Sequence, residues 1–211
     1  MHLLDDTHTC TWICKRFLDL ILTGAYNIYH MRPIPLSKRK ALFHAKPEEL
    51  IRVYTFQHKA ALDVAKDRGY FTGNEDYIED WLLEPYKWIR AEMPKHIDNF
   101  SGDYPIWAYL KRPHIKEFKK YPDDVLITAF VPRKRILFSD YSHWHIPLNN
   151  GPICFSEEEW DSFEGDVRDT WHHCLDICKS AKGDSWKTGT NYIQACIDRL
   201  YVTDIIATKH K

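Results

Sequence analysis

The sequence predicts an α+β fold, a single mixed domain with a small, mostly antiparallel sheet and several helices, one of them long. Two observations predict this class. Strand-like and helix-like segments alternate irregularly along the 211 residues, and consecutive strand-like segments near the C-terminus favour antiparallel pairing. Hydrophobic residues make up 44% of the chain and charged residues 28%, which is enough apolar material for the core of one domain.

The first 49 residues are predicted to form an N-terminal helix followed by a linker or arm. Apolar side chains recur at helical spacing over residues 10–26. Two prolines and a basic run follow in residues 31–40, where we expect no regular structure. The main domain is therefore predicted to span residues 50–211.

The main domain is predicted to begin with two strands and two helical regions. β-Branched and aromatic residues predict a strand over 50–56 and a shorter one over 104–110. Between them, residues 58–69 are predicted to form a helix that places small apolar side chains inward and stops at a glycine. A second helical region covers 76–93, and Pro85 is expected to kink or split it.

Four further strand-like segments follow. Residues 124–132 alternate clearly enough for a strand, and residues 135–139 either continue it or pair with it. Residues 192–202 and 204–210 are strand-like and close the chain.

One long helix is predicted between these strands, over about 156–181. Ser156 and Glu159 have the spacing of a capping box, and apolar residues then recur at every third or fourth position. Cys174 and Cys178 lie on this apolar stripe, and another pair of cysteines has the same spacing near the N-terminus. Because free cysteine behaves as a small buried hydrophobe, we expect structural thiols and no zinc site.

Charge and hydropathy exclude several classes of partner. The formal net charge is −1, and the basic runs at 37–40, 114–120 and 132–135 are short, so a nucleic-acid coat protein is not indicated. No apolar run approaches the roughly 20 residues that span a bilayer, and the N-terminus lacks the basic start of a signal peptide. We therefore expect a cytoplasmic protein without a membrane partner.

The stretch from Ser139 to Asn150, "SDYSHWHIPLNN", has two interpretations. In the first, Asp140 caps a helix that Pro147 limits to about one turn, and Trp144 packs inward. In the second, Asp140, His145 and Asn149 line a pocket at the end of a strand. The spacing of these residues specifies no reaction.

From about residue 51 to 209 the chain resembles a bacterial family known as domain of unknown function 3841. The order and spacing of several short motifs carry the resemblance, although Tyr109 stands where the family is expected to have tryptophan. The name implies no activity. The motifs are Tyr54 to Gln57, Pro105 to Tyr109, Val131-Pro132, Ile136 to Asp140, Trp144-His145, Leu148-Asn149 and Ile193 to Ala195.

The first functional hypothesis is a ligand-binding or regulatory module with an aromatic-lined pocket for a nucleotide or other small molecule. Aromatic residues make up 14% of the chain, and stacking on them needs no catalytic acid. Binding of nucleic acid and the oligomeric state are left open. The candidate ligand-binding residues are Arg52, Thr55, Gln57, Trp107, Tyr109, Trp144 and Asn149.

The second hypothesis is an enzyme similar to ADP-ribosyltransferases, with NAD as its cofactor or substrate. The segment from Arg52 to Phe71 loosely resembles the opening of that fold, which implies that a late-strand glutamate should follow. The chain has no glutamate after Glu164, so Gln194 or Asp198 would take its place. His145 would orient a hydroxyl group.

The third hypothesis is a metal-dependent nuclease or hydrolase. Asp140 and His145 would act together, with a metal ion held by Asp123 or Asp124. Adjacent acids of this kind also cap turns. The ligand-binding and transferase hypotheses require Gln57, Trp107, Tyr109, His145 and Gln194 to converge in one concavity at an edge of the sheet.

Overall fold

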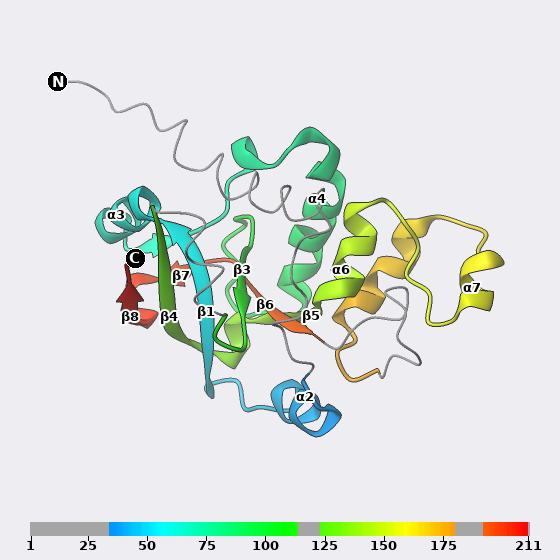
Figure 1. The fold of residues 1–211 in the computed structure, drawn as a ribbon, viewed down its shortest axis with the longest axis horizontal. Coiled ribbons are helices and arrows are strands. Elements are labelled where there is room, and N and C mark those ends of the chain that lie inside the picture. Colours follow the sequence, from blue (N-terminus) through cyan, green and yellow to red (C-terminus); the bar gives the residue numbers. More distant parts are fainter. Residues whose placement is uncertain (1–33, 114–122, 180–191, 211) are drawn as a thin grey trace.

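The computed structural model describes residues 34–113, 123–179 and 192–210, and Figure 1 shows its helices arranged around one long, curled sheet. The first half contains α2 (Leu36–Phe43), β1 (Leu50–His58), α3 (Lys59–Arg68), β2 (Tyr70–Phe71), η2 (Glu75–Tyr77), η3 (Asp80–Leu82), α4 (Leu83–Glu92), η4 (Met93–Lys95) and β3 (Ile106–Tyr109). The second half contains β4 (Asp124–Pro132), η5 (Arg133–Arg135), β5 (Leu137–Asp140), α6 (Tyr141–Leu148), α7 (Glu157–Asp161), η6 (Val167–Leu175), β6 (Ile193–Ile197), β7 (Leu200–Tyr201), η8 (Val202–Asp204) and β8 (Ile205–Lys209).

The strands form a six-stranded sheet in the order β5-β6-β3-β1-β4-β8, and β2 pairs with β7 in a separate ribbon. All of these pairings are antiparallel. The predicted α+β class with a mostly antiparallel sheet is therefore confirmed. The sheet is larger than the small one that the sequence predicted.

The sheet must curl strongly between β4 and β5. Three strands lie between them in the sheet order, yet only residues 133–136 connect them. In a flat sheet, strands spaced by about 4.8 Å would place β4 and β5 roughly 19 Å apart. The connection would span about 18 Å if fully extended, and it is shorter than this because residues 133–135 form a 3-10 turn. The curl gives the sheet an inner and an outer face.

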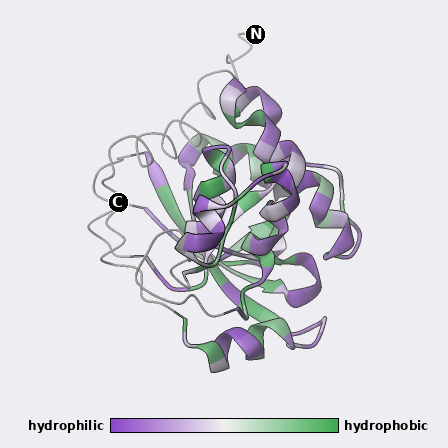
Figure 2. Ribbon diagram, turned by 90° about the vertical axis from the view of Figure 1, so that its right-hand side faces the viewer, coloured by the Kyte–Doolittle hydropathy of each residue, from purple (hydrophilic) through white to green (hydrophobic). Residues whose placement is uncertain are grey.

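The inner face carries the main hydrophobic core. Alternate residues of β1, including Ile51 and Val53, point to it and lie opposite Val131 and Ala129 of β4. Residues from β3, β5 and β6 join the same cluster, and α3 adds Leu62 and other side chains. Figure 2 shows apolar colour along the central strands and polar colour on much of the surrounding helices.

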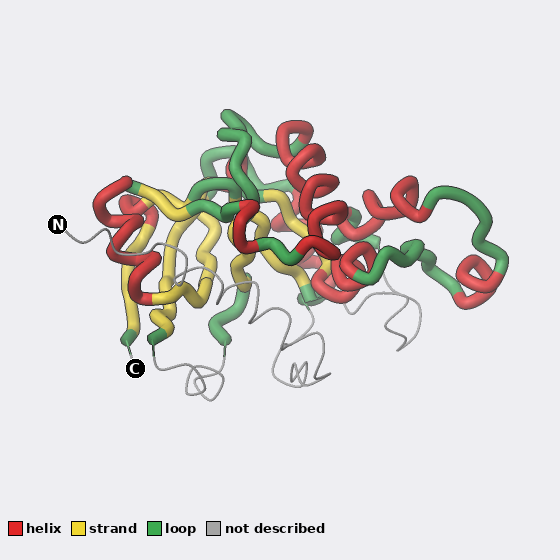
Figure 3. The backbone as a smooth tube through the Cα atoms, turned by 90° about the horizontal axis from the view of Figure 1, so that it is seen from above, coloured by secondary structure: helices red, strands yellow, loops and turns green. Residues whose placement is uncertain are grey.

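The outer face is covered by α4, α6 and η6 only where it is formed by β5, β6 and β3. A second cluster there joins Leu137 and Cys196 of the sheet to buried residues of these helices, among them Ile89, Trp144 and Cys174. Figure 3 shows the strands on the left and the helices of the 141–175 region extending to the right. On the part of the outer face formed by β1 and β4, the aromatic side chains belong to neither hydrophobic cluster.

Several predicted elements are confirmed, with boundaries close to those expected. The strand predicted over 50–56 is β1, and the helix predicted over 58–69 is α3. The imidazole of His58 caps α3 by accepting the N–H of Ala60 at 3.2 Å. Gly69 ends the helix with a φ of 92°, a left-handed conformation that glycine adopts without steric cost.

The prediction of one long helix over 156–181 is wrong. The structure has the short helix α7 and then the 3-10 segment η6, with Gly165 between them at a φ of 135°. The predicted cap is present, because the Ser156 hydroxyl accepts the Glu159 N–H at 3.1 Å. The apolar spacing that suggested one continuous helix instead buries Trp171 and Cys174 from η6.

Three other details differ from the prediction. Residues 135–139 neither continue β4 nor pair with it, because β5 pairs with β6. The region 76–93 is a series of 3-10 turns followed by α4, and Pro85 lies in the first turn of α4, where a missing N–H costs little. The helix after Asp140 is eight residues long and contains Pro147 near its end.

The arm before the main domain is partly helical. The sequence predicted no regular structure over 31–40, but α2 begins directly after Pro35, which the fixed φ of proline permits. Arg39 of α2 is buried and donates hydrogen bonds to the carbonyls of Ile177 at 2.8 Å and Lys179 at 3.1 Å. The helix predicted over 10–26 lies outside the described residues. Among the described helices, none has the length and apolarity to cross a bilayer.

Candidate functional site

The outer face of the sheet brings together several of the predicted ligand-binding residues. Antiparallel register places Ser139, Gln194, Tyr109, Tyr54 and Thr128 directly opposite one another on five successive strands. Directly opposed residues in a sheet point to the same side. Tyr109 and Gln194 are therefore neighbours, as the sequence predicted, and Tyr54 completes the row on β1.

Five aromatic rings lie on this side of the sheet, and we call them the outer aromatic face. All five are partly exposed, and Phe56 and Tyr109 approach edge to face with ring centroids 6.3 Å apart. Four of them, all except Trp107, belong to neither hydrophobic cluster among the described residues. The five are Tyr54 and Phe56 on β1, Trp107 and Tyr109 on β3, and Phe130 on β4.

One end of the outer aromatic face continues into the core. The Trp107 ring lies 4.9 Å from that of Trp144 on α6, and Tyr86 of α4 contacts both, at 6.4 and 5.8 Å between centroids. Trp144 is fully buried, as the capped-corner interpretation expected. The indole N–H groups of both tryptophans are buried without an acceptor among the described residues.

The other end of the face is basic. Arg52 of β1 is exposed, and its guanidinium carbon lies 5.0 Å above the Phe130 ring. Lys111 and Arg112, both exposed, directly follow β3, whose Tyr109 is opposite Tyr54, so they lie toward the same end as Arg52. A cation bordering a row of rings is a natural partner for an anionic aromatic ligand.

Thr55 and Gln57 do not join this face. They alternate with Tyr54 and Phe56 on β1, so their side chains point inward, opposite Ile127 and Val125. The Gln57 amide donates to the Thr55 hydroxyl at 2.9 Å, and that hydroxyl donates to the Trp107 carbonyl at 3.0 Å. The concavity that the sequence predicted, with Gln57 beside Trp107 and Gln194, is therefore not formed.

The stretch after β5 follows the capped-corner interpretation. One carboxylate oxygen of Asp140 accepts the N–H groups of Ser142 at 2.9 Å and His143 at 3.1 Å, which caps α6. His145 lies 2.7 Å from the Tyr141 carbonyl through Nδ1, and Asn149 donates to the His145 carbonyl at 2.7 Å. All three side chains thus hold the ends of one helix.

The ring of His145 is kept neutral by its surroundings. Burial lowers its pKa below the ordinary value of 6.5, against the opposing effects of the Tyr141 carbonyl and the Asp140 charge. Because a carbonyl only accepts, Nδ1 must carry the proton in the neutral ring. The tautomer of His145 is therefore fixed by the helix that it helps to close.

The predicted catalytic pairs are separated by the topology. Asp124 begins β4 and lies opposite His58 of β1, whereas Asp140 ends β5, which pairs with β6. No group of three or more His, Cys, Asp or Glu side chains is placed to hold a metal ion in the part of the chain that the structure describes. Burial also raises the pKa of the Cys174 and Cys196 thiols, which keeps them protonated.

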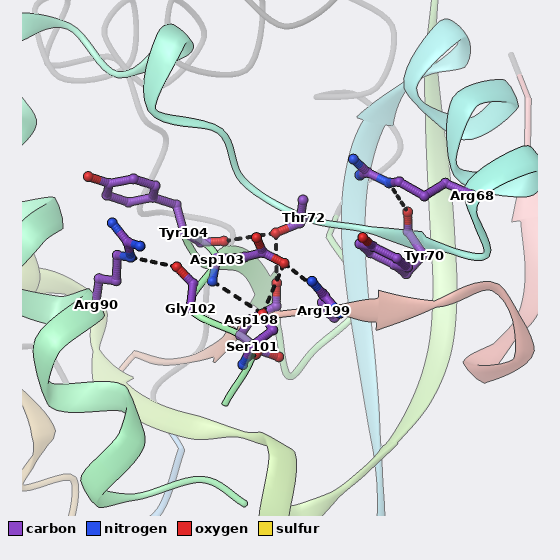
Figure 4. A network of polar contacts seen from close by, with 10 residues as sticks. All are labelled: Arg68, Tyr70, Thr72, Arg90, Ser101, Gly102, Asp103, Tyr104, Asp198 and Arg199. Carbon is purple, nitrogen blue, oxygen red and sulfur yellow. Dashed lines mark hydrogen bonds and ion pairs between the residues drawn. The ribbon is translucent and has the colours of Figure 1, made fainter. Parts of the chain in front are cut away.

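A polar network that the sequence did not predict joins the turn between β6 and β7 to the loop before β3 (Figure 4). Asp198 is buried, and its carboxylate accepts the Ser101 N–H at 2.6 Å. Arg199 donates to Asp103 at 2.6 Å and also lies 4.3 Å above the Tyr70 ring. The turn-forming run from Ser101 to Asp103 was the available signal, but its partner residues are almost 100 positions away.

Asp198 therefore has a structural partner and does not face the rings that a transferase would use. Gln194 is on the same side of the sheet as Tyr109, and its buried amide lies 3.4 Å from the Ser139 hydroxyl. Because an amide carries no negative charge, Gln194 cannot replace the missing glutamate.

Comparison with known proteins identifies a family. The family model described as domain of unknown function DUF3841 matches residues 52–209, which include all but the first two residues of β1, the strands β2 to β8 and the whole outer aromatic face. No curated protein and no solved structure matches the chain. The match covers about three quarters of the sequence, including the outer aromatic face and the stretch from Ser139 to Asn150. This chain therefore belongs to the DUF3841 family.

Proposed function

We propose that this domain binds a nucleotide, with the base stacked on the outer aromatic face and the phosphates near its basic end. The observation that carries the proposal is the set of partly exposed rings on adjacent strands, Tyr54, Tyr109 and Phe130 among them, which lie outside both cores. A sheet face with rings on neighbouring strands is a suitable platform for bases, because every base has a flat π-face.

The charges at the border favour a ligand that carries phosphate. Arg52 is exposed beside Phe130, and Lys111 and Arg112 follow β3 toward the same end. Arginine is well suited to phosphate because its planar fork donates two parallel hydrogen bonds. An uncharged flat ligand would make no use of this end.

The binding hypothesis is better supported than the transferase hypothesis. Both hypotheses lose Thr55 and Gln57, which lie on the opposite face of the sheet from Trp107 and Tyr109. The transferase also required an acid in place of the missing glutamate, and the carboxylate of Asp198 is bonded to the Ser101 N–H. Stacking requires no acid.

The proposal is tested by measuring ATP and NAD binding by isothermal titration calorimetry. Tyr109→Ala should weaken binding about 5- to 100-fold, since one base stacked on one ring contributes about 1–3 kcal/mol. Tyr109→Phe keeps the ring and should bind nearly as well as the unchanged protein. Phe43→Ala removes a ring that is 51% exposed on α2 and is not part of the outer aromatic face, and it should have no effect.

A second arm separates base stacking from phosphate binding. Arg52→Ala should weaken ATP binding severalfold while leaving adenosine binding unchanged. Equal affinity of the unchanged protein, Tyr109→Ala and Phe43→Ala for ATP, or no heat of binding from any nucleotide, would contradict the proposal.

A further inference from the structure

We infer that the ligand of the outer aromatic face is a single-stranded nucleic acid that places successive bases on separate rings. This inference rests on the proposed function and specifies its ligand. It starts from the fact that the rings are distributed over three neighbouring strands, β3, β1 and β4, and are not gathered around one point.

The face offers more than one stacking position. Tyr109 and Phe130 lie on strands separated by β1, so roughly 10 Å separates their positions across the sheet. One base cannot cover both rings. Tyr109 forms one position with its edge-to-face neighbour Phe56, whereas Phe130 forms another beside Arg52. A mononucleotide would leave the second position empty.

The cation nearest to both positions is placed where a linking phosphate would lie. Arg52 is on β1, the strand between β3 and β4, and it is directly opposite Phe130. Its side chain is exposed, and no ion pair to it is present among the described residues. A chain of nucleotides has one phosphate between each pair of bases, and Arg52, whose guanidinium lies 5.0 Å over the Phe130 ring, is on the strand between the two ring-bearing strands.

Further cations extend the border beyond one nucleotide. Lys111 and Arg112, both exposed, follow β3 toward the end of the face where Arg52 lies. Because the whole chain has a formal net charge of −1, attraction to a polyanion must come from this local arrangement. Both RNA and DNA share the chemistry that these side chains recognise, so the two are separate arms of the test.

The test is a length series measured by fluorescence anisotropy with labelled oligonucleotides of one, two, four and eight residues, in both ribo- and deoxyribo- forms. Affinity should rise at least tenfold between one and four nucleotides and should fall as salt is raised. A duplex of the same sequence should bind more weakly, because its bases are stacked on each other. Preference for one sugar would identify RNA or DNA.

The decisive variant is Phe130→Ala. It should weaken binding of the four-residue oligonucleotide at least fivefold and leave binding of a mononucleotide unchanged, whereas Tyr109→Ala should weaken both. Phe43→Ala is the matched control and should change neither. Circular dichroism and the melting temperature establish that each variant is folded.

The outcomes separate this inference from the proposed function. Nucleotide binding that depends on Tyr109, but with no gain from added nucleotides and no effect of Phe130→Ala, would overturn the inference and leave the proposed function standing. Absence of binding by mononucleotides and oligonucleotides alike would overturn both.

Discussion

His145 illustrates how a residue that suggests catalysis can instead be part of a helix. Its Nδ1–H is directed at the Tyr141 carbonyl 2.7 Å away, and its ring packs against Tyr141 with centroids 4.4 Å apart. Burial lowers the pKa of the imidazole below 6.5, so the folded protein favours the neutral ring. This has a measurable effect on stability.

Replacing His145 should change how stability depends on pH. The unfolded chain takes up a proton at His145 near pH 6.5, whereas the folded protein takes it up only at lower pH. The free energy of unfolding therefore falls as pH drops below about 6.5, by up to about 1.4 kcal/mol per pH unit for one group, until the folded pKa is reached. In His145→Asn, whose amide can still donate to Tyr141, this fall should be smaller.

Urea unfolding between pH 5 and pH 8 measures the effect. His44→Asn is the matched control, because His44 is exposed at the end of α2. Its pH dependence should equal that of the unchanged protein. Identical slopes for His145→Asn and the unchanged protein would show that the ring is not held neutral by the fold.

At the scale of elements, the sequence predicts helix boundaries well where a capping residue or a glycine marks them. The end of α3 at Gly69 and the caps at Asp140 and Ser156 follow from residue types and short spacings. The continuous helix over 156–181 failed because apolar spacing does not reveal a break at Gly165, where φ is 135°. Partners of β5 and β8 depend on the curl of the sheet, which no local pattern encodes.

The candidate site shows the same division. Because alternate residues of a strand point to opposite faces, the sequence of β1 already separates Tyr54 and Phe56 from Thr55 and Gln57. The predicted site was wrong because it combined residues from both faces of the strand. Which face is closed by helices and which is left partly exposed depends on where α4 and α6 pack, and the partial exposure of Phe130 follows only from that packing.

Two glycines should respond differently to the same substitutions. Gly69 needs a positive φ but has open space, so Gly69→Ala should cost about 1 kcal/mol and Gly69→Asn less, because asparagine tolerates that conformation. At Gly73 an added Cβ would lie 2.8 Å from the Tyr104 carbonyl oxygen, within the bridge that joins the two segments. Both Gly73→Ala and Gly73→Asn should therefore cost about 2 kcal/mol.

Thermal and urea denaturation of the four variants test this contrast. The comparison of Asn with Ala at each position is its own control, because backbone entropy changes similarly in both. If Gly73→Asn were more stable than Gly73→Ala, the cost at Gly73 would not be a steric clash. If Gly69→Asn were no more stable than Gly69→Ala, the cost at Gly69 would not come from its positive φ.

At the scale of the whole molecule, the segment that precedes the family-matched region is attached to the rest of the chain. Ile34 lies in the inner core, and the buried Arg39 bonds to the carbonyls of Ile177 and Lys179. These contacts join residues separated by about 140 positions. The matched region, 52–209, therefore folds against a helix that lies outside it.

Arg39→Met should destabilise the whole protein by about 3 kcal/mol. Methionine fills much of the space but leaves two carbonyl oxygens without their donor, and a hydrogen bond to a charged group contributes about 1.5–3 kcal/mol. Lys40→Met makes a similar change at an exposed position of the same helix and should shift the urea midpoint little. Because Arg39 joins α2 to the segment after η6, its loss should lower the unfolding midpoint of the entire domain in one cooperative transition. Loss of α2 alone, with the sheet unaffected, would mean that the helix rests on the domain without stabilising it.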